Sequence, residues 1–118
     1  MKALVQKRIV GNFVYANDLE KTSQWYCENL GFTLGVHDFS NFVELTIDGD
    51  YVLHLLKTDN EVPAVRASFS FGTDDIKETH RLLLARGVEV QPLERYSDHK
   101  SFTLKDCVGN PLMISQFD

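Results

Sequence analysis

Two side chains that could move protons, Glu44 and His54, lie at equal distances from Gly49, five residues before it and five after it. Asp48-Gly49-Asp50 has the composition of a hairpin turn, in which glycine readily takes positive φ. Opposed residues of two paired strands share one face of the sheet, so we expect the carboxylate and the imidazole to be neighbours. A carboxylate in that position can orient the ring and favour its protonated form.

Several interpretations of this pair stay open at this stage. Glu44 and His54 are candidate catalytic residues that act as an acid–base couple. They are also compatible with a cross-strand ion pair at the edge of a pocket. Hydrogen bonding to a ligand is a third interpretation, and a partial metal site completed by water is a fourth.

The sequence predicts two short helices, each with residues that favour a helix start and a helix end. In the stretch Asn17–Phe32, Asn17 is the expected N-cap, Glu20 at position N3 completes a capping box, and Gly31 is the glycine that ends the helix. The second helix is expected to begin at Asp75, with Glu78 completing a capping box, and to end at Gly87.

The remaining periodic stretches alternate in polarity and predict β-strands. The expected strands are Arg8–Tyr15, Thr33–Val36, Asn41–Ile47, Tyr51–Lys57, Arg66–Gly72, Val88–Gln91, Ser101–Lys105 and Pro111–Gln116. Equivalent helix starts (Asp18 and Asp75), helix ends (Gly31 and Gly87) and hairpin glycines (Gly49 and Gly109) are separated by 57, 56 and 60 residues. Such a repeat indicates two copies of one β-α-β-β-β unit that must pack together to bury their sheets.

We therefore expect an α+β protein with a single domain over residues 1–118. The first module spans about residues 1–58, a linker about 58–64, and the second module about 65–118. The polar stretch Thr58–Pro63, which ends in proline, is the linker candidate.

Composition narrows the range of partners. The 118 residues carry a formal net charge of −5, and 43% of them are hydrophobic. No run of lysine and arginine could follow a phosphate backbone, and no apolar stretch could span a bilayer, so we expect neither nucleic-acid nor membrane binding. The first residues lack the apolar core of a signal peptide, and Cys27 and Cys107 are expected to be reduced thiols, which favours a cytoplasmic protein, although a disulfide between them stays open.

Three motifs resemble the vicinal oxygen chelate superfamily, which comprises glyoxalases, bleomycin resistance proteins and dioxygenases. The motifs are D-L-E-K-x3-W-Y-x3-L-G-F at Asp18–Phe32, D-I-x-E-x8-G-V at Asp75–Val88, and F-x-L-K-D-x2-G-N-P at Phe102–Pro111. The resemblance implies two tandem βαβββ modules whose sheets form an incomplete barrel with the helices outside. It also implies a pocket that often holds a divalent metal ion.

In such a family four positions would supply the metal ligands. By motif spacing they fall on Gly11, His54, Ser68 and Met113 of this chain. Only His54 is a good ligand for zinc, nickel or iron, because glycine has no donor side chain and a thioether binds these ions poorly. We therefore expect no metal and no other cofactor, with a divalent metal as the alternative.

Strand alternation places a mixed set of aromatic and small polar side chains on the face away from the helices. This face is a candidate binding site for a small organic ligand. Its predicted ligand-binding residues are Phe13, Tyr15, Phe42, Glu44, Thr46, His54, Ser68, Ser70, Thr103 and Met113. The function expected is that of a metal-free binding protein for an aromatic, cationic or antibiotic-like compound.

The alternative is an enzyme of the lyase, isomerase or dioxygenase type, dependent on a metal or on Glu44 and His54 as acid and base. Its metal-dependent version would need a ligand set other than the four family positions. A homodimer is also expected, because open-sided modules leave sheet edges and apolar surface to cover.

Overall fold

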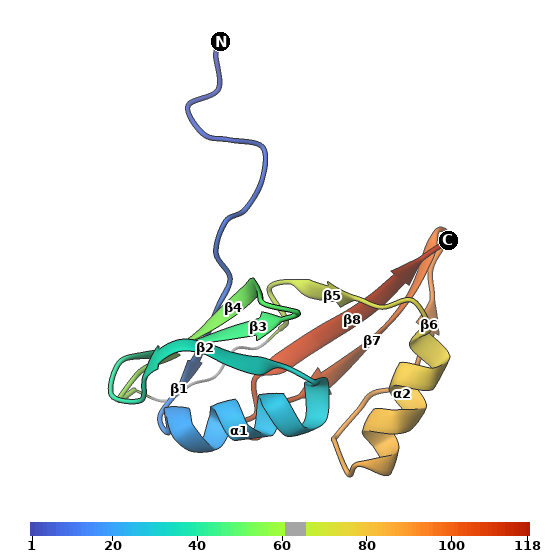
Figure 1. Cartoon of the computed structure of the whole chain (residues 1–118). Coiled ribbons are helices and arrows are strands. Elements are labelled where there is room, and N and C mark those ends of the chain that lie inside the picture. Colours follow the sequence, from blue (N-terminus) through green and yellow to red (C-terminus); the bar gives the residue numbers. More distant parts are fainter. Residues whose placement is uncertain (61–65) are drawn as a thin grey trace.

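The computed structural model describes residues 1–60 and 66–118, and it has the α+β architecture expected from the repeat (Figure 1). The first module consists of β1 (Phe13–Ala16), α1 (Leu19–Leu30), β2 (Thr33–Asp38), β3 (Phe42–Ile47) and β4 (Asp50–Lys57). The second consists of β5 (Ser70–Gly72), α2 (Ile76–Ala85), β6 (Glu94–Arg95), β7 (His99–Lys105) and β8 (Pro111–Phe117).

Each module folds into its own open sheet, and the two sheets have the same connectivity. The strand orders are β1-β4-β3-β2 and β5-β8-β7-β6. In both sheets the first strand pairs in parallel with the last, and the other pairs are antiparallel. The β-α-β-β-β repeat is therefore confirmed.

The helices lie on one side of the sheets, and the core lies between these two layers (Figure 1). On this side Val43, Leu45, Leu53 and Leu55 of the first sheet are fully buried, and α1 covers them. Ile114 and neighbouring apolar residues of the second sheet are buried beneath α2. Neither helix within the described ranges has the length and apolar character that crossing a membrane requires.

The helix ends follow the capping signals, with one correction. The N-cap of α1 is Asp18, whose carboxylate accepts a hydrogen bond from the backbone N–H of Lys21, and not Asn17. The side chain of Asn17 instead donates to the backbone carbonyls of Thr58 and Asn60, which lie after β4. Gly31 ends α1 with a φ of 83°, as expected.

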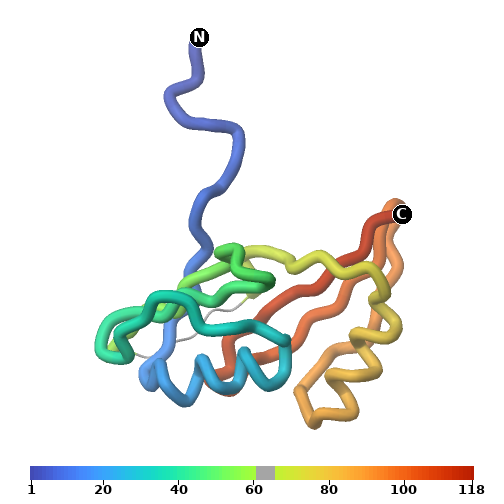
Figure 2. Tube along the Cα trace, in the orientation of Figure 1, coloured from blue at the N-terminus to red at the C-terminus, as the bar shows by residue number. Residues whose placement is uncertain are grey.

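The first strands of both modules are shorter than predicted. The strands predicted to begin at Arg8 and Arg66 begin instead at Phe13 and Ser70, where pairing with β4 and β8 starts. Residues 1–10 are exposed and run away from the body of the molecule (Figure 2). Arg8–Val10 are residues that favour strands, but they form none because no strand in the described part of the chain lies beside them.

The expected strand Val88–Gln91 is reduced to an isolated bridge between Val90 and Leu104. Hydrogen bonds from Lys105 to Glu89 and from Gln91 to Thr103 keep the segment beside β7. Pro92 follows at once, and pairing with β7 resumes only at β6. Of the predicted linker, residues 61–64 lie outside the described residues.

A β-bulge in the β3–β4 hairpin changes which side chains share a face. Leu45 pairs with Leu53, but Thr46 pairs with Tyr51, so Val52 is the extra residue. Strict alternation would put Tyr51 and His54 on opposite faces, because they are three residues apart, but the bulge between them puts both on the face of Glu44. Ile47, at the end of β3, is 42% exposed.

Polar contacts join the two modules at the turn between β7 and β8. The hydroxyl of Tyr26 on α1 donates to the Oδ2 atom of Asp106 over 2.6 Å, and both residues are buried. The other carboxylate oxygen of Asp106 accepts three backbone N–H bonds from its own turn. The Asn110 side chain donates to Asp106 and to the backbone carbonyl of Tyr15, so this turn is bonded to both α1 and β1.

Candidate functional site

Glu44 and His54 are neighbours on the face of the first sheet that α1 does not cover. They are directly opposed in the β3–β4 pair, and Nε2 of His54 lies 3.6 Å from Oε1 of Glu44. The side chains are 25% and 32% exposed, so both can be reached by a ligand. We call this surface the His54 face; it carries Phe13, Tyr15, Phe42, Glu44, Thr46, Tyr51 and His54.

The other ring nitrogen of His54 is held by Tyr51, a residue that the sequence did not indicate. The hydroxyl of Tyr51 lies 2.7 Å from Nδ1 of His54. It also accepts from the backbone N–H of Asn12 and lies 3.3 Å from the Asn12 carbonyl. When Tyr51 donates to Nδ1, the ring proton is on Nε2 and faces the Glu44 carboxylate; when Tyr51 donates to Asn12, Nδ1 carries the proton and Nε2 is free to accept one.

Aromatic rings surround the imidazole on this face. The ring of His54 has centroid distances of 4.8 Å to Tyr51, 5.7 Å to Phe13 and 6.1 Å to Phe42. Phe13 is 50% exposed. Such rings offer apolar area to a flat ligand and negative π-faces to a cation, while Glu44 supplies a single carboxylate.

Gly35 leaves room for Glu44 at the outer edge of the sheet. A bulge in β2 places Gly35 beside β3, where an added Cβ would lie 3.0 Å from the Thr46 methyl group and 3.3 Å from the Glu44 carboxylate. Glycine at this position therefore allows the strands to approach while Glu44 keeps its side-chain position.

The predicted ligand-binding residues of the second module form a separate group on the second sheet. Ser70 pairs with Met113, which pairs with Thr103, so the three side chains share one face. The Ser70 hydroxyl lies 2.6 Å from that of Ser115. Ser68 is exposed and precedes β5. The ten residues thus lie in two groups on two sheets, and their role as one ligand site stays a prediction.

The residues at the family's four ligand positions do not fit a divalent metal ion. His54 has one carboxylate beside it, whereas Gly11, Ser68 and Met113 offer no strong donor. In residues 1–60 and 66–118 no three side chains of histidine, cysteine, aspartate or glutamate are grouped to hold a metal.

The two cysteines and His80 lie away from the His54 face. Cys27 and Cys107 are free thiols, and burial raises the pKa of both. His80 lies against Phe102 and contacts the carbonyl of Gln91, so it packs α2 onto the sheet. These residues contribute nothing to the His54 face.

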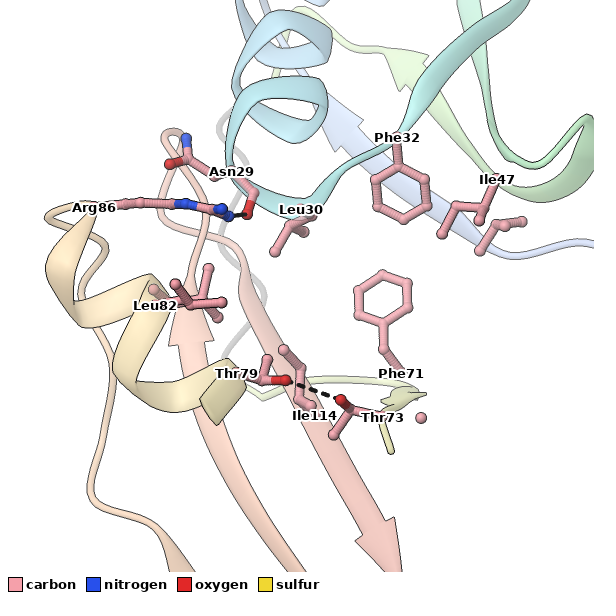
Figure 3. A pocket seen from close by; sticks show the side chains of 13 residues that line it. Asn29, Leu30, Phe32, Ile47, Phe71, Thr73, Thr79, Leu82, Arg86 and Ile114 are labelled. Atoms are coloured by element: carbon pink, nitrogen blue, oxygen red, sulfur yellow. Dashed lines mark hydrogen bonds between the residues drawn. The ribbon is translucent and has the colours of Figure 1, made fainter. Parts of the chain in front are cut away.

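A cavity of about 420 Å³ lies on the other side of the molecule, between the helices (Figure 3). It is lined by the end of α1, by α2 and by the aromatic pair Phe32 and Phe71. None of the ten predicted ligand-binding residues lines it. Sequence alternation could not have found this cavity, because it forms where the two modules meet.

Many solved structures have a fold similar to that of this chain. An integron cassette protein from the mobile metagenome of Halifax Harbour sewage outfall shares 24% identity at a TM-score of 0.82, covering 95% of this chain and all of the other. Lactoylglutathione lyase from Agrobacterium tumefaciens shares 19% identity at a TM-score of 0.77, covering 94% of each chain. TnmS3, an antibiotic binding protein from Streptomyces sp. CB03234, shares 23% identity at a TM-score of 0.76, covering 98% and 100%.

At these identities the likeness shows the fold alone. No curated protein matches the sequence. The family model of the glyoxalase, bleomycin resistance protein and dioxygenase superfamily, by contrast, matches residues 7–114, which include both modules and all three motifs. The chain therefore belongs to the glyoxalase/bleomycin resistance protein/dioxygenase superfamily.

Proposed function

We propose that this protein binds a small aromatic or cationic organic compound on the His54 face, without a metal and without turnover. The observation that supports the proposal is the group of rings around His54 with the Glu44 carboxylate 3.6 Å from Nε2. Aromatic walls provide contact area, and one carboxylate selects a positive charge. Antibiotic binding by a structural neighbour is compatible with a ligand of this size and kind.

Binding of a cationic planar dye tests the proposal. Ethidium, titrated by fluorescence, is expected to bind the wild-type protein and to bind the Glu44→Gln variant roughly tenfold more weakly, the loss of about one charge-assisted contact. Glu28→Gln is the matched control, because Glu28 is exposed on α1 and its carboxylate contacts only Gln24 among the described residues. Equal affinity of Glu44→Gln and wild type would contradict the proposal.

A second candidate is acid–base catalysis by the same pair. The contact of Tyr51 with Nδ1 supports it, because a held ring keeps Nε2 near the Glu44 carboxylate, and both side chains are partly exposed to a substrate. Once a substrate is known, His54→Ala should fold normally and lose turnover. Stoichiometric nickel, zinc, manganese or iron in protein purified without chelator, lost in His54→Ala, would instead favour a metal-dependent enzyme.

We further propose that the protein is a homodimer. Phe13 of the His54 face is 50% exposed, and Ile9 and Val10, which precede it in the chain, are 81% and 68% exposed. Val36 is 66% exposed on β2, which forms the opposite, unpaired edge of the first sheet. A second copy would cover such edges and apolar side chains. Light scattering after size exclusion at micromolar concentration should give twice the chain mass, and a monomer would refute the proposal.

A further inference from the structure

The cavity between the helices, which we call the junction cleft, has the size and position of a ligand site. Its volume of about 420 Å³ falls within the range of small-molecule pockets. Both modules contribute to it, with the end of α1, Phe32, β3 and β4 on one side and α2, β5 and β8 on the other (Figure 3). It lies on the helix side of the sheets and shares no residue with the His54 face.

The walls of the junction cleft are apolar. Phe32 and Phe71, one from each module, meet with ring centroids 5.8 Å apart at an angle of 56°. Ile47 and Leu82 also line the cleft and are 42% and 37% exposed, which leaves large apolar side chains facing an open space. An aromatic ring or a short hydrocarbon chain would remove this surface from water.

Arg86 supplies a positive charge at the rim of the cleft. One nitrogen of its guanidinium, Nη1, donates to the backbone carbonyl of Asn29 at the end of α1 over 2.7 Å (Figure 3). Among the described residues no carboxylate lies within 4.0 Å of Arg86, whereas Arg81, one turn earlier on α2, makes two hydrogen bonds to Glu78. Arg86 therefore keeps N–H donors for a planar anion.

The helix ends near Arg86 do not cancel its charge. The C-terminal carbonyls of α2 accept hydrogen bonds from the backbone N–H groups of Arg86, Gly87 and Val88. At the end of α1, Gly31 bonds the carbonyl of Cys27 and Arg86 bonds that of Asn29. The negative partial charge of a helix end resides on unsatisfied carbonyls, so these contacts weaken its repulsion of a bound anion.

The opposite end of the cleft offers hydrogen-bond acceptors. The Thr79 hydroxyl donates to the carbonyl of Asp75, and it lies 2.9 Å from the hydroxyl of Thr73. Either threonine can be the donor in the contact between the two hydroxyls, so each oxygen already has a partner. A carboxylate at this end would have to displace one of these bonds and would meet no charged side chain among the lining residues, whereas Arg86 offers it a charged N–H donor.

We propose that the junction cleft binds a small amphipathic carboxylate, with its carboxylate on Arg86 and an aromatic or short aliphatic body against Phe32 and Phe71. This site is separate from the one proposed on the His54 face, and neither depends on the other. The ligand class follows from a guanidinium that contacts no carboxylate among the described residues and lies beside an apolar hollow of limited volume.

The test uses 4-phenylbutyrate as the probe, with 4-phenylbutanol and 4-phenylbutylamine as matched compounds of the same body. In ¹⁵N-resolved NMR titrations, 4-phenylbutyrate should shift the amide signals of Thr79, Leu82 and Arg86, and leave those of Glu44 and His54 in place. It should bind roughly tenfold or more tightly than the alcohol, because the charged contact with Arg86 is lost in the alcohol.

Arg86→Gln should remove this preference, and Arg81→Gln should retain it, because Arg81 is paired with Glu78 and does not line the cleft. Leu82→Trp would fill the cleft and leave the Arg86 guanidinium in place, so it should abolish binding. This variant tests the proposal whether or not Arg86→Gln folds. Equal binding of acid, alcohol and amine would overturn the proposal. Shifts confined to the His54 face, or no shifts at millimolar probe, would overturn it as well, and neither result bears on dye binding by Glu44.

Discussion

Replacing Tyr26 by phenylalanine is expected to lower the free energy of unfolding by about 2 kcal/mol, the value of one hydrogen bond to a charged group. The side chain is fully buried, and its hydroxyl donates to Asp106 over 2.6 Å. Asp106 keeps its bond from the Asn110 amide on the same oxygen, so the variant loses one bond without leaving the carboxylate unpaired. For a chain of this length such a loss corresponds to a fall in melting temperature of about 8 °C.

Urea denaturation followed by circular dichroism measures the effect. Tyr15→Phe is the matched control, because Tyr15 is 48% exposed and its hydroxyl makes no hydrogen bond among the described residues. That variant should lie within about 0.5 kcal/mol of wild type. If Tyr26→Phe were no less stable than Tyr15→Phe, the bond between α1 and the β7–β8 turn would not contribute to stability.

Alkaline pH supplies a second readout of the same bond. Burial, followed by the charge of Asp106 and its hydrogen bond, raises the pKa of Tyr26 above its usual range. The folded protein thus holds this proton at pH values where the unfolded chain releases it. The advantage of wild type over Tyr26→Phe should be complete below pH about 10 and then fall by up to about 1.4 kcal/mol per pH unit.

Two other substitutions test the N-cap of α1 and the close approach of β2 to Glu44. Asp18→Ala should cost about 1 kcal/mol by removing the N-cap of α1, measured by thermal unfolding against Asp74→Ala, whose carboxylate caps no helix. Gly35→Ala should cost about 1 kcal/mol and weaken dye binding, since its Cβ would press on Glu44 and Thr46. Gly72→Ala, where an added Cβ meets nothing within 4 Å, should change neither, and equal effects at both glycines would contradict the crowding argument.

The fold could be predicted because its signals are local and occur twice. Gly31 and Gly87 end the helices with positive φ, and Asp75 caps the second helix as expected. What failed was the length of strands such as Arg8–Tyr15, because strand formation depends on a neighbour that the sequence does not display. The junction cleft was missed for a related reason: its residues come from both modules and share no local pattern.

The neighbouring position of Glu44 and His54 was predicted correctly, but on an incomplete physical basis. The turn itself has two residues, Asp48 and Gly49, with φ values of 52° and 81°, and it pairs Ile47 with Asp50. Continued regularly, this register would place Glu44 opposite Leu53 and turn His54 toward the helix side. The extra residue Val52 shifts β4 by one position and restores the pair.

Tyr51 pairs with Thr46 before the bulge, so the same bulge brings His54 onto the face of Tyr51, whose hydroxyl contacts Nδ1. One inserted residue thus assembles the carboxylate, the imidazole and the residue that orients it. The alternation of apolar and polar residues on either side of Gly49 fits both registers, so it cannot show where a bulge lies. In this protein the chemistry of the candidate site therefore depends on a backbone irregularity that the residue pattern alone does not specify.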